Sequence, residues 1–173
     1  MAAFTISMSG PFPSGTTITR LGGPNEGGHK GEWYNRFGMD LGVSAGTEVR
    51  AAFEANVTAF HQHDPSKDSS KEYGAQIFMR SPNDMMGGFY THISSVPAAI
   101  SPGAYVNRGD LLGTVFVVTG GASHLHMALV EIIGGLPGGK YTGVNLYKEF
   151  LTNLGGAVKS VTFNQDGTPP TVA

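Results

Sequence analysis

The chain of 173 residues has no cysteine and few charged residues, and both absences narrow its chemistry. Without cysteine it can form no disulfide and offers no thiolate as a nucleophile or a metal ligand. Charged residues make up only 14% of the chain, the net charge is -2, and Lys and Arg form no cluster. Since binding to phosphates needs clustered positive charge, we expect no nucleic-acid partner.

Long apolar stretches are also missing. The longest run, residues 111–118, is interrupted by Gly113 and Thr114 and is too short for a transmembrane segment. The first residues lack the charged and apolar regions of a signal peptide, so none is expected in this sequence. A secreted or cell-surface protein is compatible with these features, and the localisation stays open.

Glycine and proline are abundant, with 26 and 10 residues, which favours many tight turns between short strands. Alternating apolar residues predict strands within 37–60, and further strands are expected at 75–80, 88–93, 111–118 and 124–133 between turn residues. Apolar residues at helical spacing predict one helix at 145–154. The expected fold class is therefore all-β, with mainly antiparallel sheets that form a groove and one short C-terminal helix.

We expect one domain over residues 1–173, in three parts. Residues 1–31 are expected to form an N-terminal arm, residues 32–135 the core, and residues 136–173 a C-terminal helix and tail. The polar stretch 61–73 predicts a loop, and the proline-rich end is expected to fray.

Two histidines stand at the start of the best predicted strand, in His124-Leu125-His126. Residues two apart in a strand face the same side, so both imidazoles project together. Such a pair can hold a metal or move a proton, and the alternative is a pair of surface histidines. His61 and His63 have the same spacing but begin a polar loop, where a surface pair is the better interpretation.

Asp40 and His92 are polar residues inside apolar strands. A carboxylate in such surroundings is costly unless a cation or hydrogen-bond donors face it. His92 by itself is more often a half-buried structural histidine than a catalytic one.

Six short motifs support a resemblance to a known family. Arg36-Phe37-Gly38-Met39-Asp40 and residues 46–51, 73–77, 90–93, 106–113 and 123–127 follow in order. Over about residues 34–133 the chain resembles the lysostaphin/LytM-type zinc endopeptidases, which hydrolyse peptidoglycan. The resemblance implies that Asp40 and His126 are zinc ligands, and that His92 and His124 position water or stabilise the tetrahedral intermediate.

The first ligand of the family departs from this pattern. The histidine expected four residues before Asp40 is Arg36 here, and a guanidinium has no lone pair for a metal. One hypothesis is that Arg36 pairs with Asp40 and replaces the metal charge. Alternatively His29 is the third ligand, or His92 or His124 moves into the metal shell.

The hypothesis preferred on these grounds is a non-catalytic, lectin-like groove with a disabled zinc site. Its partners would be a glycan, a peptidoglycan fragment or a peptide. Ligand contacts are expected from Arg36, Trp33, Tyr34 and Tyr90, because aromatic faces suit sugar rings. Expected cofactors are none, zinc if the site is rescued, or calcium held by Asp40 with carbonyl oxygens.

Two alternatives stay open at this point. One is an active zinc metalloendopeptidase that cleaves cell-wall peptides with a rearranged ligand set. The other is a structural or assembly domain in which the groove is incidental. Metal content separates the enzyme from the lectin-like groove, because stoichiometric zinc favours the enzyme.

Overall fold

The computed structural model describes residues 2–62, 74–118 and 120–173. Most of the expected loop at 61–73, including His63, lies outside them. The described elements are short strands with a few short helical turns. In chain order they are β1 (Phe4–Met8), β2 (Thr19–Gly22), α1 (Trp33–Arg36), β3 (Gly38–Gly42), β4 (Glu48–Arg50), β5 (Ala55–His61), β6 (Ala75–Arg80), β7 (Met86–Ser94), β8 (Tyr105–Val106), β9 (Leu111–Val115), β10 (His124–Ile133), β11 (Lys140–Gly143), α2 (Tyr147–Leu151), the 3-10 turn Asn153–Gly156, β12 (Lys159–Phe163) and β13 (Thr171–Val172).

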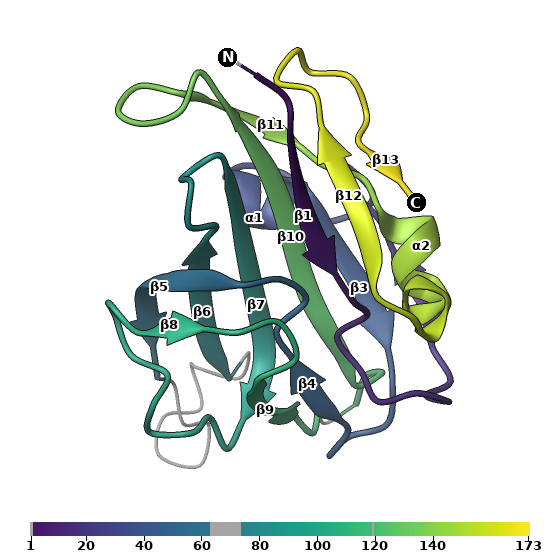
Figure 1. Cartoon of the computed structure of the whole chain (residues 1–173). Coiled ribbons are helices and arrows are strands. Elements are labelled where there is room, and N and C mark those ends of the chain that lie inside the picture. Colours follow the sequence, from purple (N-terminus) through teal and green to yellow (C-terminus); the bar gives the residue numbers. More distant parts are fainter. Residues whose placement is uncertain (1, 63–73, 119) are drawn as a thin grey trace.

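The larger sheet has ten strands, with the main order β2-β3-β10-β7-β6-β5-β8. Every strand pair in it is antiparallel. The long strand β10 runs through the middle of the molecule, between β3 and β7 (Figure 1). The expected fold class, mainly antiparallel sheets with only short helices, is confirmed.

A second, three-stranded sheet has the order β1-β12-β13 and joins the two ends of the chain. Figure 1 shows it crossing in front of β3 and β10. Met8 and Phe163 of this sheet belong to the same buried cluster as Met39, Leu41 and Met127. The core therefore lies between the two sheets. The expectation that the C-terminal end frays was wrong, because Thr171–Val172 pairs with β12.

The helical elements differ in part from those expected. α2 falls inside the helix predicted at 145–154, and Leu154 at positive φ turns the chain after it. α1 was not predicted, since its four residues are too few to show a helical period. It lies directly before β3 and packs on β10 and β3.

Cross-strand pairing aligns one row of polar side chains across five neighbouring strands of the larger sheet, β3, β10, β7, β6 and β5. Asp40 pairs with His126, His126 with Thr91, Thr91 with Gln76, and Gln76 with His61. Directly opposite residues of an antiparallel pair face the same side. We call these five residues the polar row. It lies on the sheet face opposite the core residues Leu41, Leu125 and Tyr90.

Candidate metal centre

One end of the polar row forms a group of potential metal ligands. His29, Asp40 and His126 each offer a ligand atom, and these atoms lie within 4.8 Å of one another. His29 Nε2 is 3.1 Å from Asp40 Oδ2, and His126 Nδ1 is 2.9 Å from Asp40 Oδ1. The three side chains are largely shielded from solvent, with exposed fractions of 12%, 19% and 8%.

The strand ladder positions two of these ligands. Asp40 on β3 and His126 on β10 are direct partners in the register. The imidazole of His126 lies over Gly38, where an added Cβ would stand 2.2 Å from the ring atom Cε1. Gly38 is therefore needed because any side chain there would displace the His126 ring.

Backbone carbonyl groups determine which ring nitrogen of each histidine carries a proton. His29 Nδ1 is 2.8 Å from the carbonyl oxygen of Gly23, and His126 Nε2 is 2.7 Å from that of Tyr34. A carbonyl oxygen only accepts hydrogen bonds, so each of these ring nitrogens carries a proton and donates it. In the neutral imidazole the other nitrogen then keeps its lone pair, and in both residues that nitrogen faces Asp40.

The arrangement of these donor atoms suits a bound metal ion. Two nitrogen lone pairs directed at a carboxylate repel it unless a positive charge lies between them. Protonating both imidazoles would supply that charge, and one shared cation supplies it while leaving both rings neutral. Two imidazole nitrogens and one carboxylate are a ligand set of catalytic zinc sites, in which a fourth position stays open for water. The residues fit zinc better than calcium, which prefers oxygen ligands throughout.

The Asp40 carboxyl group is held in its ionised form. Burial raises its pKa, but protonated imidazoles at His126, His124 and His29, the first also through a hydrogen bond, together lower the pKa below its ordinary value, and a cation bound between neutral rings would act in the same direction. An ionised carboxylate is the form that binds a metal.

A third imidazole stands beside this group. His124 Nε2 is 3.7 Å from Asp40 Oδ1, and His124 Nδ1 is 2.9 Å from the carbonyl oxygen of Ala122. By the same rule Nδ1 donates its proton to that carbonyl group, so Nε2 keeps a lone pair on the side of Asp40. His124 can therefore accept a proton from a water molecule at the centre.

His92 reaches this cluster through a backbone irregularity. Its ring centroid lies 4.6 Å from that of His124 and 6.0 Å from that of His126. Strict alternation would place His92 on the core side, next to Tyr90. Its φ of 68° and the register shift between β6 and β7 at this point break the alternation, as in a β-bulge. The bulge brings His92 into contact with the other two imidazoles.

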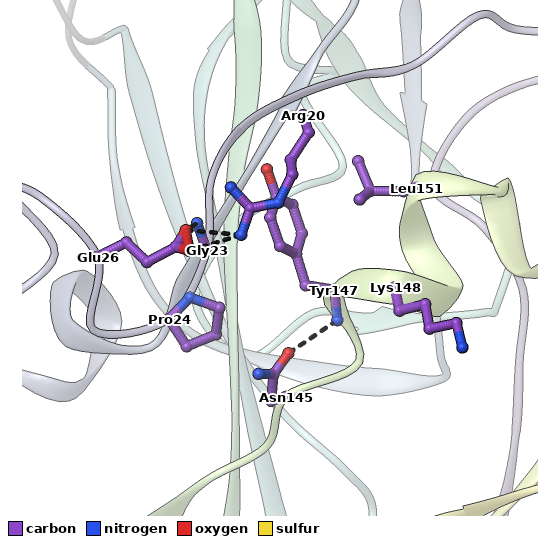
Figure 2. A pocket seen from close by; sticks show the side chains of 8 residues that line it. All are labelled: Arg20, Gly23, Pro24, Glu26, Asn145, Tyr147, Lys148 and Leu151. Atoms are coloured by element: carbon purple, nitrogen blue, oxygen red, sulfur yellow. Dashed lines mark hydrogen bonds and ion pairs between the residues drawn. The ribbon is translucent and has the colours of Figure 1, made fainter.

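The loop that carries His29 is braced by side chains, as Figure 2 shows around a small pocket. Arg20 Nη2 lies 2.5 and 2.9 Å from the two carboxylate oxygens of Glu26. Glu26 also accepts a hydrogen bond from the backbone N–H of Gly23, whose carbonyl oxygen holds His29. These contacts connect Arg20 to the first ligand.

Tyr147 of α2 ties the end of β2, from which that loop starts, to Asp40 on β3. Its hydroxyl oxygen accepts hydrogen bonds from the backbone N–H groups of Leu21 and Gly22, both at 3.0 Å. The same hydroxyl donates to the backbone carbonyl of Asp40 at 2.7 Å. Sequence reasoning missed the role of Tyr147, which belongs to no motif, and that of Gly38, which was quoted only as a member of the motif at 36–40.

The structure corrects the hypothesis about Arg36. Its side chain is exposed, and its guanidinium carbon lies 6.0 Å from the Phe37 ring centroid. The Asp40 carboxylate instead faces His29, His124 and His126. The pairing of Arg36 with Asp40 was wrong. His29 occupies the place of the missing ligand, because the loop and α1 bring it back over the sheet from eleven residues before Asp40. A role of Arg36 in ligand binding stays a prediction.

The predicted aromatic contacts separate into two groups. Tyr90 is fully buried, and its hydroxyl oxygen accepts a hydrogen bond from the Ala52 N–H at 3.0 Å, so it cannot touch a ligand. Burial raises its pKa, and the phenol stays neutral. Trp33 and Tyr34 of α1 are half-buried and pack on Phe78, with ring centroids 6.2 and 5.2 Å apart.

Comparison with known proteins agrees with this site. The family described as Peptidase family M23 matches residues 34–140, more than half of the chain. The chain therefore belongs to Peptidase family M23, the lysostaphin/LytM-type family that its motifs resemble. The match begins after His29, so the first ligand identified by the geometry lies outside it.

Solved structures share the fold. The catalytic domain of the prophage-encoded M23 protein EnpA from Enterococcus faecalis, crystallised as a mutant, is 21% identical with a TM-score of 0.52, and the match covers 79% of this chain and 94% of that one. The antimicrobial peptidase lysostaphin from Staphylococcus simulans is 18% identical with a TM-score of 0.50, over 72% of this chain and 47% of that one. This chain thus spans about half the length of lysostaphin. A search of curated proteins returned no match.

These findings overturn the preference for a non-catalytic, lectin-like groove. That hypothesis depended on a missing third ligand, and His29 supplies one together with Asp40 and His126. The alternative hypothesis, a zinc endopeptidase, agrees better with both the family and the site. No helix among the described residues is long and apolar enough to cross a membrane.

Proposed function

We propose that the protein is a zinc endopeptidase that hydrolyses peptide bonds in the peptide part of bacterial cell walls. The observation that carries the proposal is the convergence of His29, Asp40 and His126, with both imidazoles held in the form that presents a lone pair to the centre. Membership in Peptidase family M23 supports the reaction type and the class of substrate.

The roles of the residues follow from their positions. His29 Nε2, His126 Nδ1 and the Asp40 carboxylate would hold the ion. When bound, zinc lowers the pKa of a water molecule and polarises the carbonyl group of the bond to be cut. The carbonyl oxygens of Gly23 and Tyr34 orient the two imidazoles and so prevent them from rotating out of the centre.

His124 is assigned to proton transfer. Its Nε2 accepts a proton from the attacking water, while its Nδ1 stays bonded to the carbonyl oxygen of Ala122. His92 lies edge-on to His124 and limits the orientations of its ring, as the second imidazole beside the water.

Metal analysis combined with two variants tests the proposal. The purified wild-type protein is expected to hold about one zinc per chain and to release soluble fragments from purified peptidoglycan. His29→Ala is expected to lose both properties. The nearby Arg36→Ala is the matched control for metal binding and should keep the zinc, because Arg36 does not face Asp40.

The outcomes test whether His29 is the first ligand. Zinc lost in Arg36→Ala but retained in His29→Ala would show that the assignment of His29 is wrong. A wild-type protein that binds zinc stoichiometrically but cleaves no cell-wall peptide would contradict the proposed activity. His124→Ala is expected to retain zinc and to lose about 100-fold or more in kcat.

A further inference from the structure

A pocket of about 250 Å³ lies on the same sheet face, beyond the metal centre. Its walls are aromatic: Trp33 from α1, Phe78 from β6 and Tyr141 from β11. The Trp33 ring lies 6.2 Å from Phe78 and 5.9 Å from Tyr141, and all three side chains are half-buried. Ala59 and Gly87 also line the pocket, and their small size leaves the space between the rings.

Aromatic contacts connect this pocket to the metal centre. The Phe78 ring is 4.6 Å from Phe89, and Phe89 is 5.9 Å from the imidazole of His126. His61, which lines the pocket, is also the last residue of the polar row that begins at Asp40. Three strand spacings separate His126 from His61, about 14 Å, which an extended peptide of about four residues spans. A peptide cut at the centre can therefore place a side chain in the pocket.

One charged residue, Arg80, lines the pocket, and none of its lining residues is Asp or Glu. Arg80 Nη1 is 3.9 Å from Asp84 Oδ1, a long contact between two partly exposed groups, which adds little stability and leaves the guanidinium able to bind another anion. An apolar group with a carboxylate next to it complements both features of the pocket.

We propose that this pocket is a specificity subsite for an apolar or aromatic side chain of the substrate, whose neighbouring carboxylate pairs with Arg80. The subsite lies about four residues from the bond that is cut. This inference rests on the proposed function for its peptide substrate, but the binding chemistry of the pocket can be tested without catalysis.

Trp33 makes the test direct, because it is the only tryptophan in the chain and its fluorescence reports on this pocket. Zinc-free protein is titrated with N-acetyl-phenylalanine, which has a free carboxylate, and with its amide, which has none. Both are expected to change the fluorescence of Trp33 saturably, with Kd values in the millimolar range. The acid should bind about two- to fivefold more tightly than the amide, as an exposed ion pair allows.

Three variants locate the binding. Arg80→Gln should remove the preference for the acid and leave the binding of the amide unchanged. Ala59→Phe should fill the pocket and abolish both titrations, and Tyr141→Ala, which removes one wall, provides the same test if Ala59→Phe does not fold. Arg50→Gln is the charge-matched control, since Arg50 pairs with Glu48 away from the pocket and should leave both titrations unchanged.

Other outcomes overturn the proposal. An unchanged Trp33 signal with both ligands, or a preference for the acid that survives Arg80→Gln, shows that the subsite is wrongly assigned. A saturable response to N-acetylglucosamine in place of both phenylalanine ligands would assign the pocket to a sugar. If the protein proves to lack zinc and activity but the titrations behave as expected, the proposed function fails and the subsite stands.

Discussion

His126 and His29 each face one carboxylate oxygen of Asp40, but the chain holds them by different means. His126 belongs to a central strand with hydrogen-bonded neighbours on both sides, and its partner in the ladder is Asp40 itself. His29 belongs to a glycine-rich loop with no ladder, in which Glu26 accepts a hydrogen bond from the Gly23 N–H and the Tyr147 ring packs against Gly23. The strand side, with His126, is thus held by the backbone hydrogen bonds of the sheet. The loop side, with His29, depends on a few side-chain contacts.

Removing either ligand is expected to have the largest effect. His126→Ala and His29→Ala should each weaken zinc binding by more than about 100-fold, beyond the effect of an outer-shell residue. They should differ in the metal-free protein. Each variant leaves one carbonyl group without its donor, at a cost of about 1–3 kcal/mol, but only His126→Ala also removes a ring that packs on Gly38 of the central ladder, so it should cost more than His29→Ala. Metal titration and urea unfolding measure both, and equal losses of stability would contradict the comparison.

Adding one methyl group to each side is the next test. Gly38→Ala places a Cβ against the His126 ring and should cost about 1–3 kcal/mol and weaken zinc binding. Gly28→Ala, next to His29 in the loop, meets nothing within 4 Å and should change stability by about 0.5 kcal/mol or less. Thermal unfolding and zinc titration of both variants give the result. An intact zinc site in Gly38→Ala would show that the strand side can adjust.

Tyr147 joins the two sides, so its hydroxyl group is the third target. Tyr147→Phe leaves the N–H groups of Leu21 and Gly22 without their acceptor, at a cost of about 1–3 kcal/mol. Zinc affinity should fall by about 10- to 100-fold, as for other residues behind a metal ligand. The matched control is Tyr105→Phe, at an exposed tyrosine far along the chain, which should leave zinc affinity unchanged.

The smallest expected effect concerns the pH range over which the loop contact persists. The hydrogen bond from Arg20, and next that from the Gly23 N–H, lower the pKa of Glu26. A carboxyl group with a lowered pKa contributes its stabilisation above its unfolded pKa of about 4.3 and loses it as the pH falls through the folded value. Arg20→Gln should raise the pKa of Glu26 toward the ordinary value in an NMR titration. An unchanged pKa would assign the shift to the Gly23 contact alone.

Much of the strand side could be predicted from the sequence. The mainly apolar segment 124–133, which follows two glycines, predicted β10 with the bounds that the structure has, and the spacing of His124 and His126 placed both on one face. Asp40 was identified as a costly carboxylate in an apolar strand, and the structure gives it three histidine neighbours. These features depend on local alternation, which a strand imposes on its own residues.

The sequence by itself determined the antiparallel β fold, the central His-x-His strand and the presence of a carboxylate beside it, because strand periodicity links residue spacing directly to direction in space. Only the tertiary structure decided that His29 rather than Arg36 completes the centre, since a loop of glycines has no period that predicts where it returns. It also decided that His92 faces the centre, because a bulge between β6 and β7 reverses the direction that alternation assigns to it.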